Sequence, residues 1–189
     1  MDLVEFGGAR LHVHVAMPGI PGEADRVKRA IASLDPAIIV ADIDTQEALS
    51  LRTQFVPSFV DGLVAHEANR RFAKGDPAGD HPLVATARLA STHKADLIAL
   101  RPTAKRPNFF ARRRAAAALV EISADDPRSF AIEVSPALAK AQVWRAREDA
   151  EAALPRLERA LDGGRAPVAI VTQAHRADAL LTLMGRGSA

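Results

Sequence analysis

The chain contains no cysteine and no tyrosine, and only one tryptophan among its 189 residues. Without cysteine there is neither a disulfide framework nor a thiolate nucleophile, and any metal ion must be bound by His, Asp and Glu. No segment approaches the roughly 18 consecutive apolar residues that a membrane-spanning helix needs. The first residues include Asp2 and Glu5 and lack the basic stretch of a secretion signal. We therefore expect a cytoplasmic protein with no membrane partner.

The formal net charge of the chain is also small, at +2 at pH 7. One segment departs from this balance, and its basic residues are Lys105, Arg106, Arg112, Arg113 and Arg114. Such a run is most often a solvated helix start or loop, and contact with an anion or a nucleic acid is the less frequent alternative. Aromatic residues that could stack on bases are scarce, so we do not expect a nucleic-acid partner.

Five segments have the pattern of β-strands. Residues Leu3–Phe6 and Arg10–Val15 alternate in polarity around Gly7 and Gly8, which predicts an N-terminal β-hairpin. Short apolar runs rich in β-branched residues are typical of strands buried on both faces. Three such runs follow along the chain, at Ala37–Ala41, Asp96–Leu100 and Ala166–Val171.

Amphipathic spacing predicts helices between these strands. The predicted helices are Glu23–Leu34, Thr45–Gln54, Ser58–Ala73, Leu83–His93, one within residues 103–122, Pro136–Leu161, and a last one that ends at about Met184. We expect Pro155 to kink or divide the long helix. Gly75–Gly79 is predicted as a loop, and Phe130–Val134 fits either a strand or the start of a helix. The alternation predicts one α/β domain over residues 1–189, with a mostly parallel central sheet covered by helices.

Ligands of such sheets bind beyond the carboxyl ends of the strands. His14, Asp42, Arg101 and His175 each stand at or just after the end of a predicted strand. Two imidazoles and a carboxylate are a ligand set that suits zinc, manganese or cobalt. A single His or Asp at such a position more often has a structural role, and Asp44 before a helix is typical of an N-cap.

Other candidate sites have weaker patterns. His66 and Glu67 lack a second histidine at the spacing of a zinc protease, so we interpret Glu67 as a helix surface residue. The serines lack a nucleophile-elbow context, and no glycine-rich loop would hold a phosphate. These absences argue against a serine hydrolase and against a P-loop enzyme.

Four blocks of the chain, in order, resemble the TraB/PrgY family, which is related to the Tiki proteins. The blocks are Leu11–Val15, Pro36–Asp44, Lys94–Pro102 and Val168–His175. They correspond to the family's histidine motif, its acidic strand, its strand ending in arginine, and its closing histidine motif. The charged helix before the last block, which contains Arg145, Arg147 and Glu148, stands where the family has an arginine-bearing helix.

The resemblance implies a divalent-metal hydrolase that acts on peptides, because the Tiki relatives are metal-dependent peptidases. His14 and His175 match the family's motif histidines, Asp42 its glutamate, and Arg101 its strand-end arginine. By this correspondence His14, His175 and Asp42 would bind manganese, cobalt or zinc. Asp42 would also act as general base on the bound water, and Arg101 would stabilise developing negative charge.

This sequence departs from the family pattern at four positions. Leu11 and Thr172 replace glycines, Asp42 is shorter than glutamate, and Glu47 stands where arginine is expected. Two functions therefore stay open: a metal-dependent hydrolase of the TraB/Tiki type, and a degenerate, non-catalytic regulatory domain. The second would bind a peptide or a small anionic ligand through Arg101 and the basic run. A small α/β domain with alanine-rich helices could also form a homodimer.

Overall fold

The computed structural model describes residues 2–50, 57–74, 81–102, 107–164 and 166–186. Within them the chain forms a five-stranded sheet in the order β1-β2-β5-β3-β4. β1 is antiparallel to β2, whereas β2, β5, β3 and β4 are parallel. The strands span Asp2–Phe6 (β1), Ala9–Ala16 (β2), Ile38–Asp44 (β3), Asp96–Arg101 (β4) and Val168–Gln173 (β5). The predicted α/β class with a mostly parallel sheet is confirmed.

The N-terminal hairpin is confirmed as well, and its turn explains why two glycines stand there. Gly7 and Gly8 have φ angles of 59° and 76°. A two-residue hairpin turn with both central residues at positive φ has the twist that matches the flanking strands. Glycine adopts these angles without the steric cost that a side chain would add.

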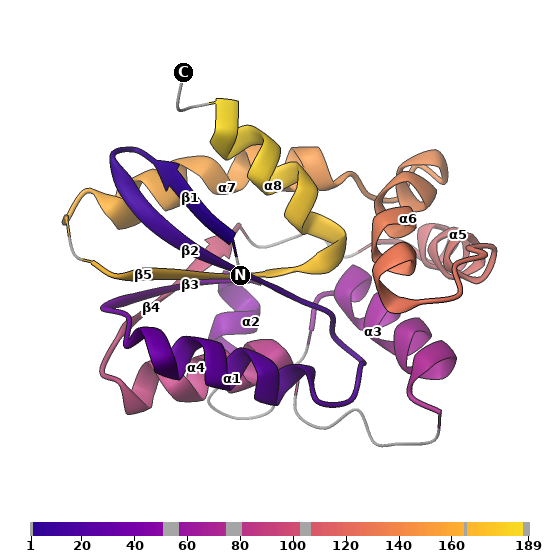
Figure 1. Cartoon of the computed structure of the whole chain (residues 1–189). Helices are drawn as coiled ribbons and strands as arrows, with labels where there is room; N and C mark the ends of the chain where they lie inside the picture. Colours follow the sequence, from indigo (N-terminus) through magenta and orange to yellow (C-terminus); the bar gives the residue numbers. More distant parts are fainter. Residues whose placement is uncertain (1, 51–56, 75–80, 103–106, 165, 187–189) are drawn as a thin grey trace.

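Two helices cover each face of the sheet (Figure 1). On one face lie α1 (Glu23–Leu34) and α4 (Pro82–Thr92), which bury Val27, Ile31 and Leu83 against Ile39 and Val171 of the strands. On the other face lie α7 (Ala146–Leu161) and α8 (Ala174–Arg186). Their side chains, among them Leu157 and Leu180, pack against the inner residues Val13, Val40 and Ile170.

A group of three helices lies beyond the carboxyl ends of the strands (Figure 1). It consists of α3 (Phe59–Phe72), α5 (Phe109–Val120) and α6 (Pro127–Lys140), packed around Val64, Leu119 and Phe130. The short α2 (Thr45–Ser50) follows β3. No helix in the described ranges has the length and apolar character needed to cross a membrane.

Glu67 is not a helix surface residue as predicted, because only 5% of it is exposed. Its carboxylate accepts hydrogen bonds from Arg70 at 2.9 and 2.5 Å and from Arg71 at 2.6 Å. Arg71 also donates to the carbonyl oxygens of Leu119 and Ile122, at the end of α5. Glu67 thus holds an arginine that caps a neighbouring helix, a contact that spacing along one helix does not reveal.

The predicted helix Pro136–Leu161 is wrong, because α6 ends at Lys140 and α7 begins at Ala146. Gln142 has a φ of 55°, and the N–H of Val143 donates to the carbonyl of Leu138 at 3.1 Å. This is a Schellman-type helix end with glutamine at the position where glycine is usual, so the sequence lacked the glycine that commonly marks the end of a helix. Pro155, expected to divide the helix, lies inside α7. Phe130–Val134, left open between strand and helix, belongs to α6.

Two further predictions fall partly or wholly outside the described residues. The helix predicted for Thr45–Gln54 is described only as far as Ser50, and Gly75–Gly79 is not described. The helix expected within residues 103–122 is present as α5, from Phe109 to Val120.

We predict that Leu157→Ala lowers the free energy of unfolding by about 2–5 kcal/mol, because it opens a cavity in a packed core. Leu157 is fully buried between α7 and the sheet. The control is Leu3→Ala on β1, where 58% of the side chain is exposed and the expected change is within about 0.5 kcal/mol. Urea denaturation of both variants measures the difference, and equal losses would contradict the assigned core.

Candidate functional site

Four charged side chains from four elements meet at the carboxyl ends of the strands. They are Asp42 of β3, Arg101 of β4, Asp61 of α3 and Arg176 of α8, and each is at most 5% exposed. We call these four residues the ionic cluster. Charged groups this deeply buried are rare unless each one is paired.

Asp42 and Arg101, both predicted site residues, form the first ion pair of the cluster. The Arg101 Nε donates to Asp42 Oδ1 at 2.7 Å. The other oxygen, Asp42 Oδ2, accepts from the Thr172 hydroxyl and from the Gln173 backbone N–H, both at 3.0 Å. Both oxygens of Asp42 are therefore engaged, and the residue links β3 to β4 and β5.

Arg101 connects this pair to two further carboxylates. Its Nη2 donates to Glu47 Oε2 at 2.8 Å and to Asp61 Oδ2 at 2.9 Å. Burial disfavours the guanidinium charge, but the surrounding carboxylates of Asp61 and Asp42 raise the pKa of Arg101 above its ordinary value. Arg101 is consequently a permanent cation surrounded by acidic groups.

Asp61 is the most contacted carboxylate, and sequence reasoning missed it. Besides Arg101, its oxygens contact His175 Nε2 at 2.9 Å and Arg176 Nη2 at 2.8 Å, and they accept from the Ser58 hydroxyl at 2.7 Å. Burial by itself would raise the pKa of Asp61, yet the guanidinium groups of Arg176 and Arg101 hold that pKa well below its ordinary value. Asp61 is therefore ionised.

His175 is the second residue of α8 and contacts Asp61 on one side and Trp144 on the other. The imidazole and indole rings meet edge to face, with 5.5 Å between centroids. Trp144 in turn stacks under Arg176, whose guanidinium lies 4.6 Å from the ring centroid, and donates from its indole N–H to Asp149 at 2.8 Å. Arg176 also pairs with Asp149. Burial lowers the pKa of His175, although Asp61 opposes this effect.

Glu47 has a structural role that accounts for its position. Its Oε2 accepts from the Asp44 N–H at 2.6 Å, while Asp44 Oδ1 accepts from the Glu47 N–H at 2.7 Å. This reciprocal pair is a capping box at the start of α2, and it agrees with the N-cap interpretation of Asp44. Burial, opposed by Arg101 and reinforced by Asp61, raises the pKa of Glu47 to about 7.

His14 lies apart from the other three predicted residues. It pairs with Val171 in the β2–β5 ladder, and strand alternation places it on the face of Ala16, which packs against α1 and α4. Asp42 lines a small cavity on the opposite face, beside α7 and α8. Burial, helped by the cation of Arg26, lowers the pKa of His14 to about 4. Its Nε2 makes no hydrogen bond to the described residues.

The structure thus joins Asp42 to Arg101 directly and His175 to them through Asp61, whereas His14 faces the other side of the sheet. Besides Asp61, sequence reasoning missed Arg176, Asp149 and Trp144. The helix predicted to begin at Ser58 is present as α3, and Ser58 caps it by accepting from the Asp61 N–H. No pattern along the chain indicated that Asp61 would meet Arg101.

The residues implied as metal ligands do not fit a metal ion. Asp42 uses both oxygens within the protein, and His175 Nε2 already contacts Asp61. The guanidinium of Arg101 occupies the position among the carboxylates that a cation would need. No cluster of three or more His, Asp or Glu side chains within the described ranges could hold a metal ion.

The ionic cluster is also closed to larger ligands. The cavity bordered by Asp42, Arg101, Asp149, Thr172 and Arg176 has a volume of about 10 Å³. This space holds one water molecule at most.

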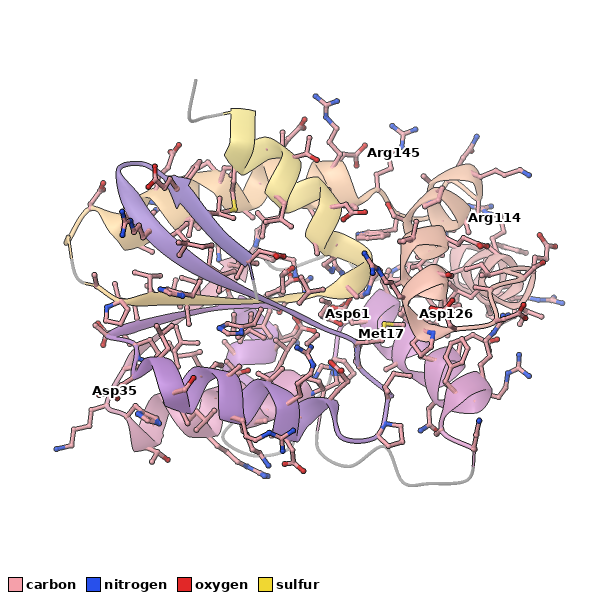
Figure 2. All side chains as sticks on the ribbon, viewed as in Figure 1. Met17, Asp35, Asp61, Arg114, Asp126 and Arg145 are labelled. Carbon is pink, nitrogen blue, oxygen red and sulfur yellow. The ribbon has the colours of Figure 1, made fainter. Side chains whose placement is uncertain are left out.

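An open groove lies beside the cluster, where β2 and β5 end. Its volume is about 580 Å³. The walls come from the ends of β1 and β2, the first turn of α1, and helices α6 and α8. The lining residues are Asp2, Val15, Met17, Glu23, Arg26, Pro127, Arg128, Ala131, Ile132, Ala174, Ala177, Asp178 and Leu181. Figure 2 labels Met17 and Asp61, which lie near each other in that view, and Met17 packs on α3, the helix that carries Asp61.

Comparison of the chain with protein-family models, with curated proteins and with solved structures finds no match.

Protein purified without a histidine tag is expected to contain much less than one equivalent of manganese, cobalt or zinc, because both oxygens of Asp42 and the Nε2 of His175 are already engaged. Elemental analysis of the wild type beside a His14→Ala/His175→Ala variant measures this, and EDTA should leave the Tm of the wild type unchanged. One equivalent of metal that is lost in the double variant would contradict the expectation.

Glu47 should make the protein less stable as pH rises from about 4.5 to 7. Its pKa is raised on folding, so in this range the folded protein retains a proton that the unfolded chain has released. His14 and His81, whose pKa values burial lowers to about 4, act in the opposite direction, because the unfolded chain binds protons that the folded protein excludes.

A comparison with Glu47→Gln therefore isolates the effect. The free energy of unfolding of the wild type minus that of Glu47→Gln should decrease from about pH 4.5 to pH 7, as measured by urea titrations at several pH values. Glu158→Gln, at an exposed position on α7, is the control for the loss of one carboxyl group. A difference that stays constant or increases would show that Glu47 is ionised throughout.

Proposed function

We propose that the protein is a non-catalytic binding domain that holds a short peptide segment in the groove beside the ionic cluster. One contrast carries the proposal. The cluster is closed by its own ion pairs around a cavity of about 10 Å³, whereas the neighbouring groove is open and has about 580 Å³. Ligand pockets in proteins are concave sites of roughly 300–1,000 Å³, so the groove has the required size.

The lining of the groove favours a peptide. Val15, Met17 and Leu181 contribute apolar surface, and Ile132 at its edge is 57% exposed. Polar side chains, among them Asp2, Arg128 and Asp178, line the groove beside these apolar residues. An extended segment can place apolar side chains on such a surface and keep its polar backbone hydrated.

The charges of the groove argue against a small anion and for a segment with a basic residue. Three acidic side chains line it, Asp2, Glu23 and Asp178, against Arg26 and Arg128. Arg26 is already bound to Glu23 at 2.8 Å and to the Val15 carbonyl. This leaves Asp2 and Asp178 facing Arg128, an excess of negative charge that attracts a cation.

In this proposal the ionic cluster positions the wall of the groove. His175 and Arg176 in the first turn of α8 are bound to Asp61 of α3. The same helix presents Ala174, Ala177, Asp178 and Leu181 to the groove. A closed ionic network is suited to fixing a helix, since every charge in it has a defined partner.

The resemblance to the TraB/PrgY family fits this proposal as a degenerate member. A hydrolase of that type needs several metal ligands with free donor atoms, whereas both oxygens of Asp42 and the Nε2 of His175 are bound within the protein, which leaves only the buried Nδ1 of His175. The donor set therefore favours the binding domain over the metal-dependent hydrolase.

Peptide binding is tested with an array of immobilised 12-residue peptides that vary in apolar and basic content, followed by fluorescence anisotropy on labelled peptides that bind. Asp178→Lys/Ile132→Ser is expected to raise the Kd about 10-fold or more, a change of about 1.4 kcal/mol. The control, Glu158→Lys/Val120→Ser, makes the same chemical changes at exposed positions on α7 and α5 and should leave the Kd within about 2-fold.

Two results would overturn the proposal. One is that no peptide binds, or that binding is equal in the groove variant and the control. The other is cleavage of the peptides, detected by mass spectrometry, that requires manganese, cobalt or zinc and is lost in His14→Ala/His175→Ala. That second result would restore the metal-dependent hydrolase.

A further inference from the structure

The outward face of α5 combines exposed phenylalanines with unpaired arginines. Of the five large hydrophobic side chains that are most exposed in the described residues, three belong to this helix: Phe109 at 65%, Phe110 at 70% and Val120 at 59%. Single exposed apolar residues are ordinary, but three on one twelve-residue helix form a patch.

Helical geometry places these residues on one side. Ala115 and Leu119 are the buried residues of α5, and they pack in the group with α3 and α6. At 100° per residue the opposite side carries Phe109, Phe110, Arg113, Ala116, Ala117, Val120 and the C-cap residue Glu121. Arg112 and Arg114 border this apolar face on its two sides. Figure 1 shows α5 at the edge of the molecule, with α6 and α3 beside it, and Figure 2 labels Arg114 at this edge.

The net charge of this face is positive, although the exposed Glu121 at the C-cap of α5 lies on it as well. Arg112, Arg113 and Arg114 are all exposed, and within the described parts of the chain none of them forms an ion pair with a carboxylate. Two of them contact aromatic rings instead: Arg112 lies 5.2 Å from the Phe59 centroid and Arg113 lies 5.9 Å from that of Phe109. The Arg112 Nε donates to the Pro107 carbonyl at 3.2 Å. Stacking leaves the remaining guanidinium N–H groups available for phosphate oxygens.

We propose that α5 binds the surface of an anionic lipid bilayer, lying in the plane of the membrane. Its phenylalanines and Val120 would enter the boundary between headgroups and acyl chains, and the three arginines would contact lipid phosphates. Phenylalanines exposed beside arginines are the side chains that such interfacial elements present to an anionic bilayer. This proposal departs from the expectation of no membrane partner, which rested on the absence of a spanning segment, because binding at the bilayer surface needs no such segment.

Two other occupants match the face less well. A second copy of the chain, related by a two-fold axis, would bring Arg113 and its flanking arginines against themselves. Single-stranded nucleic acid would satisfy the arginines, but it requires ring faces free for stacking. The Phe109 and Phe110 rings instead meet edge to face at 5.8 Å, and Arg113 covers part of Phe109. A lipid surface uses the arginines and the apolar side chains together.

The test is co-sedimentation of the full chain with vesicles of phosphatidylcholine alone or with about 30 mol% phosphatidylserine. Binding is expected with the anionic vesicles and at least about 10-fold weaker with the neutral ones. Arg112→Gln/Arg113→Gln/Arg114→Gln should weaken binding about 100-fold, and Phe109→Ser/Phe110→Ser about 10-fold or more.

The controls change a large apolar side chain, or three arginines, at exposed positions elsewhere. Leu3→Ser on β1 and the triple variant Arg10→Gln/Arg29→Gln/Arg159→Gln should bind within about 2-fold of the wild type. Because all the substituted side chains are exposed, thermal unfolding should show that each variant is folded. This experiment does not depend on the peptide groove, since α5 contributes no residue to it.

Three outcomes would overturn the proposal. The first is equal binding, or none, to the two kinds of vesicle. The second is a loss in the arginine variant without a loss in the phenylalanine variant, which would indicate general attraction to negative charge. The third is tighter binding to a single-stranded oligonucleotide than to vesicles, reduced by the phenylalanine variant, which would assign the face to nucleic acid.

Discussion

The arrangement of the strand ends depends on one buried guanidinium group, that of Arg101. It bonds to Asp42 of β3, Glu47 of α2 and Asp61 of α3, at 2.7 to 2.9 Å. Removing one partner of a buried pair costs about 3–5 kcal/mol, because it leaves an uncompensated charge away from water. Loss of Arg101 would leave three acidic groups together, so it should be more harmful than loss of any one of them. The guanidinium group of Arg101 therefore links the sheet to the helices α2 and α3 through directed hydrogen bonds, in addition to apolar packing.

The same guanidinium explains why a site of the TraB/PrgY type does not follow from matching residues. The resemblance implies a carboxylate at Asp42 that binds a metal, but here this carboxylate is the partner of Arg101. Glu47, which stands where that family has arginine, adds a second acidic partner and caps α2. An arginine and a metal ion compete for the same oxygens. A positive charge is thus present at the strand ends, but it is supplied by the protein itself.

The sequence predicts the strands better than the site, for a physical reason. Runs such as Ile38–Ala41 and Val168–Val171 identify buried strands because local hydrophobicity and β-branching are sufficient. The sequence did not indicate the end of α6, because Gln142 stands where glycine is usual. Asp126 and Pro127 are typical of a helix start, but the prediction did not place one there. The ionic cluster is harder to predict from the sequence than the helix ends. Asp61 and Arg101 are 40 positions apart, and nothing local to either one indicates that they pair.

His14 shows most clearly which features of the site cannot be predicted from the sequence. Its place near the end of a strand is readable from the sequence, but its partner strand and its face are not. β5 lies between β2 and β3, and His14 points to the α1 and α4 side while Asp42 borders a cavity on the other. The net charge of +2 does not show how the charged residues are divided between the interior and the surface. Arg101 and Arg176 are neutralised inside, whereas Arg112, Arg113 and Arg114 face solvent beside apolar side chains. A small total charge therefore coexists with a strongly basic surface on α5, and it is this local charge, not the total, that an approaching anionic surface would meet.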